Sequence, residues 1–273
     1  MSSQSGDKRN GKNSRLPAAG ERRKISTTVT KAFGIVAALA PETDRGLTLA
    51  DLSQRLAIPK STVHRYLATL LELGLAERCD TERFRLGPKV IELAGAYLAN
   101  SDLRNQSQAV LDGLSAETNE TIHLAVRSGA EVVYIAKVES RHAVRMYSFI
   151  GARLPMYCTA LGKAMLAFGP DDWLRETLAR GLDPRTPHTL TTASALKADL
   201  EAIKLQGFSF DKEENEVGVR CVGAPVFDFT GSVIAAISLS GPTDRMDRKR
   251  FAELGPVVRD AARHISRRLG YAG

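Results

Sequence analysis

Apolar residues recur three and four positions apart through the first hundred residues, which is the spacing of amphipathic helices. The first predicted helix begins at Ser26 or Thr27 and ends before Pro41. A second, short helix is predicted from about Thr48 to Leu56. Thr48 is a good N-cap for it, and Asp51, three residues later, complements this cap. The apolar positions of the first helix are Val29, Phe33, Val36 and Ala37.

The third predicted helix, over 60–73, is closed by Gly74 and has two unlike faces. The face expected to be buried holds Val63, Tyr66, Leu67, Leu70 and Leu73. The opposite face and its flanks hold Ser61, Thr62, His64, Arg65, Ala68 and Thr69. Small hydroxyl side chains together with an Arg are the types that reach base edges in the major groove of DNA.

Two short strands, 75–78 and 83–86, follow this helix around the turn at 79–82. Three helices, a tight turn between the last two and a hairpin behind them predict a winged helix-turn-helix DNA-binding domain. A small helical bundle with an ordinary solvated face is the alternative. The residues expected to contact DNA are Thr48, Lys60, Ser61, Thr62, His64, Arg65, Thr69, Arg83 and Arg85.

A linker helix is predicted over 88–101, because Pro88 suits the first turn of a helix. Its apolar stripe consists of Val90, Ile91, Leu93, Ala94, Tyr97 and Leu98. The same helix of a second subunit would bury this stripe, or the stripe packs on its own chain; the pattern leaves both open.

From residue 102 the pattern changes to strands mixed with helices, so the fold class expected for the chain is α+β with two domains. Helices are predicted at about 102–118, 160–168, 171–180, 193–206 and 247–269. Strands are predicted at 121–127, 131–138, 144–150, 208–211, 219–227 and 232–240. Adjacent strands in runs favour an antiparallel sheet. The expected organisation is a disordered tail at 1–25, a winged helix-turn-helix at 26–87, the linker helix at 88–101 and a second domain at 102–273.

The net charge of +7 suits a polyanionic partner such as nucleic acid. Most of this positive charge lies in one short segment, because residues 1–25 hold seven basic and two acidic residues, a surplus of five positive charges. A tail of this composition can attract phosphates without reading sequence, or it is a solvated leader with no role. The rest of the chain is nearly neutral.

The three cysteines, Cys79, Cys158 and Cys221, lie far apart and form no CxxC pair. This usage excludes a disulfide scaffold or a zinc ribbon as the first interpretation and favours the reducing cytoplasm. No metal and no cofactor is expected. No apolar run approaches the roughly 18 residues of a membrane helix, and no apolar stretch follows the first charges as in a secretory signal, so no membrane partner is expected.

Polar residues in the second domain suggest a pocket. Ser238 and Ser240 share one face of an apolar strand, where they are either turn residues or the floor of a pocket. Asp211 opens an acidic loop, which is most often only a solvated surface, and Cys221 reads as a small buried hydrophobe. The loop before Ala160 leads into a helix, and free amides at such sites favour carboxylates.

The stretch from Gly46 to Leu86, GLTLADLSQRLAIPKSTVHRYLATLLELGLAERCDTERFRL, and the following Gly87–Ala94 resemble the DNA-binding domain and linker of the IclR family of bacterial transcriptional regulators. Leu154–Ala167 and Asn215–Asp228 resemble the two signature stretches of its GAF-like effector domain. The resemblance implies operator DNA and a small organic acid effector as partners, with a homodimer or homotetramer. The effector-contacting positions that it implies are Gly151, Ala152, Asp211, Cys221, Ser238 and Ser240.

Within that family, four stretches resemble the branch of 2-keto-3-deoxygluconate repressors: Glu120–Leu124, Val133–Ile135, Arg145–Ser148 and Asp211–Glu214. The chain departs from that branch around the pocket loop, where it has the apolar Phe149, Leu154 and Met156. A different or less polar effector is therefore an open alternative.

The function expected is an effector-controlled regulator of carbon-source catabolic genes, a repressor by this resemblance, with an activator of aromatic- or organic-acid catabolism as the alternative. No catalytic residues are expected. A cysteine-dependent enzyme with Cys221 or Cys158 as nucleophile and His123 as base is the rival from another class, and it requires an activated thiolate beside its base. A sequence-independent DNA binder driven by the tail is the third.

Overall fold

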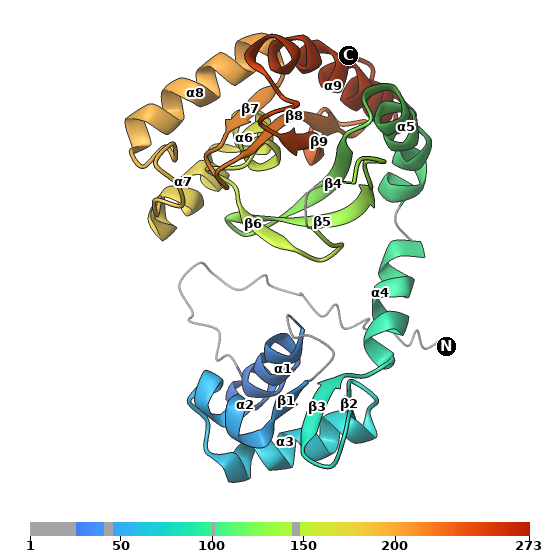
Figure 1. Cartoon of the computed structure of the whole chain (residues 1–273), viewed down its shortest axis with the longest axis vertical. Coiled ribbons are helices and arrows are strands. Elements are labelled where there is room, and N and C mark those ends of the chain that lie inside the picture. Colours follow the sequence, from blue (N-terminus) through green and yellow to red (C-terminus); the bar gives the residue numbers. More distant parts are fainter. Residues whose placement is uncertain (1–25, 41–45, 100–101, 144–147) are drawn as a thin grey trace, which may run out of the picture. The chain divides into compact units, whose positions relative to one another are not determined.

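The computed structural model describes residues 26–40, 46–99, 102–143 and 148–273 (Figure 1). The chain divides into two compact units between Gly95 and Ala96. The basic tail at 1–25 and residues 144–147 of one predicted strand lie outside the described residues. No helix in the described ranges is long and apolar enough to cross a membrane.

The first unit is a winged helix-turn-helix. It contains α1 (Thr27–Leu39), β1 (Leu47–Thr48), α2 (Leu49–Leu56), α3 (Lys60–Glu72), β2 (Ala76–Arg78), β3 (Arg83–Leu86) and the start of α4 (Lys89–Ala99). The strands form an antiparallel sheet in the order β1-β3-β2. The prediction missed β1, because two residues are too short to show a period. Ala57, in the left-handed region at φ 52°, forms the turn between α2 and α3.

The buried face of α1 differs from the predicted stripe. Ile35 and Leu39 enter the core, whereas Val29 and Phe33 are 54% and 66% exposed. The helix is apolar on several sides, so its periodicity does not select one face. Leu73, placed on the buried face of α3 by the helical wheel, is also exposed because α3 ends at Glu72 and the chain turns away at Gly74 (φ +69°).

The second unit is built on one six-stranded antiparallel sheet in the order β6-β5-β4-β9-β8-β7. Its strands are β4 (Thr121–Ser128), β5 (Glu131–Val138), β6 (Arg153–Pro155), β7 (Ser209–Lys212), β8 (Val219–Phe227) and β9 (Val233–Pro242). Its helices are α5 (Asp102–Thr118), α6 (Ala160–Phe168), α7 (Asp171–Arg180), α8 (Ala193–Gln206) and α9 (Arg248–Arg268).

The two faces of this sheet carry different helices (Figure 1). On β7, Phe210 packs on Phe251 of α9, and the preceding Ser209 donates a hydrogen bond to the carbonyl oxygen of Ala160 in α6. Neighbouring residues of a strand point to opposite faces. Helices α5 and α9 therefore cover one face and α6, flanked by α7 and α8, covers the other.

The predicted strand over 144–150 is wrong in its described part, because Ser148–Ile150 form a loop and turn. Gly151 follows at φ +93°, and its amide donates to the carbonyl oxygen of Tyr134. Strand β6, at one edge of the sheet, starts two residues later and pairs with β5. The chain thus turns at Gly151 before it joins the sheet.

Candidate functional site

Two rows of residues cross the α6 face of the sheet. Strand register places Asp211 beside Cys221, Cys221 beside Ser240 and Ser240 beside Thr121. The second row, two residues along each strand, consists of Ser209, Gly223, Ser238 and His123. Residues two apart on a strand share a face. The sheet therefore collects hydroxyl, thiol, carboxyl and imidazole groups on one surface.

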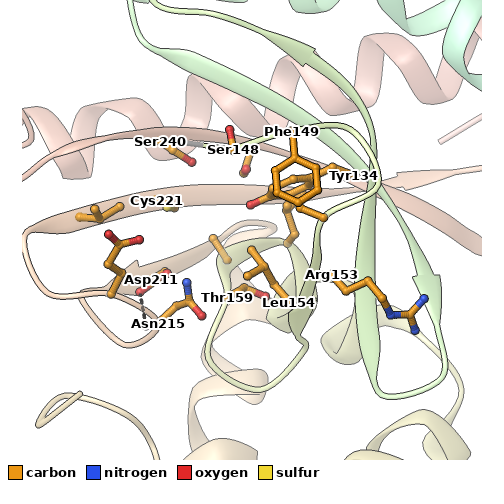
Figure 2. A pocket seen from close by; sticks show the side chains of 16 residues that line it. Tyr134, Ser148, Phe149, Arg153, Leu154, Thr159, Asp211, Asn215, Cys221 and Ser240 are labelled. Atoms are coloured by element: carbon orange, nitrogen blue, oxygen red, sulfur yellow. Dashed lines mark hydrogen bonds between the residues drawn. The ribbon is translucent and has the colours of Figure 1, made fainter. Parts of the chain in front are cut away.

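A cavity of about 270 Å³ lies over part of these rows, at Asp211, Cys221, Ser240 and Ser238 (Figure 2). Five of the six residues expected to contact an effector line it: Ala152, Asp211, Cys221, Ser238 and Ser240. Gly151, the sixth, is not among the lining residues. The alternatives left open for Ser238 and Ser240 resolve to the floor of a pocket rather than turn residues, since both are buried within β9.

The amides of Gly151 and Ala152 are already bonded within the chain. Gly151 N donates to Tyr134 O at 2.8 Å, and Ala152 N donates to Phe149 O at 3.1 Å. These two amides hold the turn in the structure. An anion would receive hydrogen bonds from them only after these contacts break.

The N-terminus of α6 forms another wall of the cavity. Thr159 caps the helix by accepting from Gly162 N, and Thr159, Ala160 and Leu161 line the cavity. Gly223 allows this approach, because a Cβ there would lie 2.7 Å from the Ala160 carbonyl carbon. The first amides of a helix have no partner within it and favour negative charge.

Asp211 is a buried carboxyl group at the cavity wall. Its Oδ1 accepts from the amide of Glu214 at 2.7 Å and of Asn215 at 3.4 Å. Burial, reinforced by the charge of Glu214, raises the pKa of Asp211 to about 7. This group therefore changes charge near neutral pH, in contrast to the solvated loop that an acidic run suggests.

Behind Asp211, a buried lysine holds the acidic loop. Lys163 Nζ on α6 lies 2.6 Å from Glu214 Oε1 and 2.8 Å from Asp199 Oδ2 of α8. Lys163 is only 1% exposed, so the ion pair lies in the interior of the domain. The Gly162-Lys163 dipeptide, which does not form a phosphate loop, serves to anchor residues 211–216.

The sequence prediction missed lining residues that come from loops or other strands. Figure 2 shows Tyr134, Ser148 and Phe149 together on one side of the cavity, opposite Asp211 and Cys221. Arg153 also lines the cavity, but its guanidinium points away from it and bonds Glu131 and Ser128. A loop position such as Ser148 has no period by which it could be found.

The thiols are not activated. Burial raises the pKa of Cys158 to about 12 and that of Cys221 well above its ordinary value. His123 Nε2 contacts Ser148 Oγ at 2.8 Å rather than a sulfur atom. Neither of these two cysteines is a thiolate at neutral pH. The activated thiolate that a cysteine-dependent enzyme requires is therefore missing at both positions. Within the described ranges, no cluster of three His, Cys, Asp or Glu side chains could hold a metal ion.

In the first unit, the polar face of α3 is open to solvent. Five of the residues expected to contact DNA are exposed on it: Lys60, Ser61, His64, Arg65 and Thr69. Thr62 on the same helix is half-buried.

The other residues expected to contact DNA also have local partners. Thr48 forms the capping box of α2 with Asp51. Arg83 donates to Gly46 O at 3.2 Å, and Arg85 pairs with Glu77 at 2.6 Å. These three residues therefore stabilise the domain through local contacts. Their contacts with DNA stay a prediction.

The chain is similar to known regulators over nearly its whole length. It is 41% identical to the HTH-type transcriptional regulator KdgR of Escherichia coli over 248 residues, which covers 90% of this chain and 93% of that protein. It is 38% identical to the regulator XynR of the same organism over 82% of this chain and 90% of that protein.

Solved structures show the same likeness. The Thermotoga maritima IclR structure has a TM-score of 0.71 at 35% identity and covers 89% of this chain and 99% of that one. An IclR homologue from Microbacterium hydrocarbonoxydans, complexed with 4-hydroxybenzoate, has a TM-score of 0.75 at 26% identity over 89% of this chain and 99% of that one.

The model of the IclR helix-turn-helix domain matches residues 28–79, and that of the bacterial transcriptional regulator IclR C-terminal domain matches 95–267. These relatives are named as HTH-type transcriptional regulators. Both units have the architecture that these families require: a helix-turn-helix and a curled antiparallel sheet with helices. The chain belongs to the IclR family of DNA-binding transcriptional regulators.

Proposed function

We propose that this regulator binds its operator through the exposed face of α3 and releases it when a small hydroxylated carboxylic acid occupies the cavity. The observation that carries the proposal is the polar surface of that cavity, to which Asp211 of β7 and Ser238 and Ser240 of β9 contribute from either side of β8. Hydroxyl and carboxyl groups in this arrangement suit the hydroxyls of a sugar acid. The resemblance to the 2-keto-3-deoxygluconate repressors makes that acid the first effector to test.

An aromatic acid is the second candidate, favoured by the other wall of the cavity. Tyr134, Phe149 and Leu154 supply an apolar surface there, and a relative of this chain has been solved with 4-hydroxybenzoate. The sugar acid and the aromatic acid would therefore contact opposite walls of the same cavity.

The effector acts by its preference between two states of the regulator. A ligand shifts such an equilibrium only by its differential affinity, typically about 1–3 kcal/mol. The direction proposed here is repression relieved by the effector, and the site of action is the cytoplasm, where the operator DNA is found.

The effector prediction concerns the two serines of the floor. Ser238→Ala combined with Ser240→Ala is expected to weaken binding of 2-keto-3-deoxygluconate at least tenfold, because each hydroxyl loses a hydrogen bond worth roughly 1 kcal/mol. Calorimetric titration measures the affinity, and a gel shift with the upstream intergenic DNA measures release. Ser194→Ala, an exposed serine on α8, is the matched control. Unchanged affinity in the double variant would show that the effector binds elsewhere.

The operator prediction concerns Arg65. Arg65→Ala is expected to weaken operator binding by roughly 1–3 kcal/mol and to relax preference at one base pair, as loss of a base contact does. The side chain is exposed, with its guanidinium carbon 5.4 Å from the ring centroid of Tyr66, so its loss is expected to change stability only slightly. Gel shifts against a library of single-base operator variants measure both effects. Arg175→Ala on α7 is the control, and equal affinity of Arg65→Ala and this control contradicts the assignment of α3.

We propose a homodimer as the smallest working unit, with a homotetramer as a possible further assembly. Large apolar side chains are exposed on α1, after α3 and on α4: Val29, Phe33, Leu73, Ile91 and Leu93. Water contact with such a surface is unfavourable, and large apolar patches mark interfaces. In a dimer, the helix α4 of the second subunit would cover the apolar stripe of α4. This is one of the two arrangements that the sequence left open, the other being packing on its own chain.

Phe33→Asp is therefore expected to raise the dissociation constant of the dimer by at least tenfold. Since Phe33 is 66% exposed in the chain, the stability of the protomer is expected to change by no more than about 0.5 kcal/mol. Sedimentation velocity over a range of concentrations measures the dimer. Leu205→Asp, at an exposed apolar position on α8, is the control. A dimer of unchanged stability would exclude the α1 face as the interface.

A further inference from the structure

Ser148 stands at the cavity wall with both its hydroxyl and its carbonyl held. Its Oγ lies 2.8 Å from Nε2 of His123. Its carbonyl oxygen accepts from Lys137 Nζ at 2.7 Å. His123 is on β4 and Lys137 on β5, and the two are register partners. Two adjacent strands of the sheet thus fix one loop residue at the cavity.

His123 is an interior histidine whose state is defined by its surroundings. It is 1% exposed and stacks on the ring of Tyr134, with centroids 4.4 Å apart. Burial, and then the charge of Lys137, lowers the pKa of His123 to about 3. The imidazole is therefore neutral at physiological pH and carries one N–H and one lone pair.

The second nitrogen of this ring decides which tautomer is present. Among the described residues, Nδ1 of His123 is buried and has no hydrogen-bond partner. A buried N–H group without an acceptor is rarer in proteins than a buried acceptor without a donor. The proton therefore belongs on Nε2, which donates to Ser148 Oγ. The Ser148 hydroxyl then keeps its own proton for another acceptor.

The rest of the cavity wall offers few donors for an anion. The guanidinium of Arg153 is turned away to Glu131 and Ser128, and the amides of Gly151 and Ala152 are bonded within the turn. Two further lining residues, Asp211 and Glu216, are acidic. A carboxylate in this cavity is thus directed to the hydroxyl donors, to the side-chain amide of Asn215 and to the N-terminus of α6.

We propose that Ser148 is a further effector-binding residue, an inference that rests on the proposed function. Its hydroxyl donates a hydrogen bond to an anionic oxygen of the effector, and the hydrogen bond from His123 holds the hydroxyl in the orientation for this. His123 acts through Ser148 and is its positioning residue. Ser148 and His123 together would favour acids over their uncharged analogues. The surface of the cavity that contains the carboxyl group of Asp211 does not provide this preference for an anion.

The tautomer can be tested without an effector. In the ¹⁵N-labelled full chain, the two ring nitrogens of a neutral histidine resonate far apart according to which carries the proton. The His123 signals are identified by their loss in His123→Gln. We expect protonated Nε2, unprotonated Nδ1 and no titration between pH 5 and 8. A proton on Nδ1 would overturn the proposal, because Ser148 would then donate to His123 and not to the effector.

The binding test uses 2-keto-3-deoxygluconate and 4-hydroxybenzoate as two carboxylates of unlike shape. Ser148→Ala is expected to weaken calorimetric binding of whichever acid the wild-type chain binds by roughly ten- to hundredfold, the range for a hydrogen bond to a charged group. Ser148→Thr keeps the hydroxyl and is expected to restore most of the affinity. His123→Leu removes the donor to Ser148 and is expected to weaken binding although Ser148 is still present.

The outcomes separate this inference from the function on which it rests. Full affinity in Ser148→Ala overturns the role of Ser148 alone, and so does equal loss in Ser148→Ala and Ser148→Thr. Binding of neither acid to the wild-type chain overturns the proposed function and this inference together. Far-ultraviolet circular dichroism and thermal unfolding of each variant, with Ser194→Ala as control, show that the loss is one of binding.

Discussion

Lys163→Met is expected to destabilise the effector domain by about 3–5 kcal/mol, because it removes one partner of a buried ion pair. Lys163 Nζ lies 2.6 Å from Glu214 Oε1, and both side chains are nearly inaccessible to water. Methionine fills a similar volume but leaves the Glu214 carboxylate in the interior without its cation. Urea unfolding, followed by the fluorescence of Trp173, the single tryptophan, measures the change.

Two further variants make this result specific. Lys197→Met, at an exposed position of α8, is the matched control and is expected to change stability by no more than about 0.5 kcal/mol. Glu214→Gln in the Lys163→Met chain is expected to restore part of the loss, because the lone buried charge disappears. A Lys163→Met chain as stable as the Lys197→Met control would show that the ion pair contributes nothing.

Asp211→Asn is expected to make the protein less sensitive to pH, with its largest stabilising effect above pH 7. The pKa of Asp211 is raised from 3.8 to about 7 in the fold. Between these values the native chain keeps a proton that the unfolded chain has lost, so the free energy of unfolding decreases as pH rises from about 4 to about 7. The maximum loss is about 4 kcal/mol, at about 1.4 kcal/mol per pH unit.

Urea unfolding of both chains at pH 4.5, 6 and 8 measures this difference. Asparagine keeps the acceptor for the amides of Glu214 and Asn215 but has no charge to bury, so the gap between the two chains is expected to widen with pH. Groups that titrate elsewhere cancel in the comparison. A gap of the same size at all three pH values contradicts the buried ionisation of Asp211.

Much of this architecture follows from sequence patterns. The helix-turn-helix with its wing was predicted within a residue or two, because capping residues and Gly74 mark the ends of its helices. The hydroxyl pair of β9 was recognised from strand alternation, although the pattern alone did not separate a pocket floor from turn residues. Five of the six effector positions implied by the family lie around one cavity. Their contacts with an effector stay a prediction.

The contacts that could not be predicted from the sequence join segments that are far apart along the chain. His123 meets Ser148 because β4 lies beside β5 and Ser148, ten residues after the end of β5, lies against His123. Lys163 reads as an ordinary helix residue until α6 is placed against Asp199 and Glu214. The exposed face of α1 was missed for another reason, since a helix that is apolar on several sides does not show which of them is buried.

The two polar rows across the sheet have a consequence for the evolution of this regulator. The residues that alternate with them, Ile122, Leu239, Val222 and Phe210, form the matching row on the opposite face, under α9. Along β7, β8 and β9, cavity-lining residues such as Asp211, Cys221 and Ser238 therefore alternate with residues that pack on the opposite face of the sheet. If the proposed effector site is correct, substitutions at Cys221 or Ser238 would change which effector binds while the packing beneath α9 is conserved. A single scaffold can in this way give rise to sensors for many metabolites.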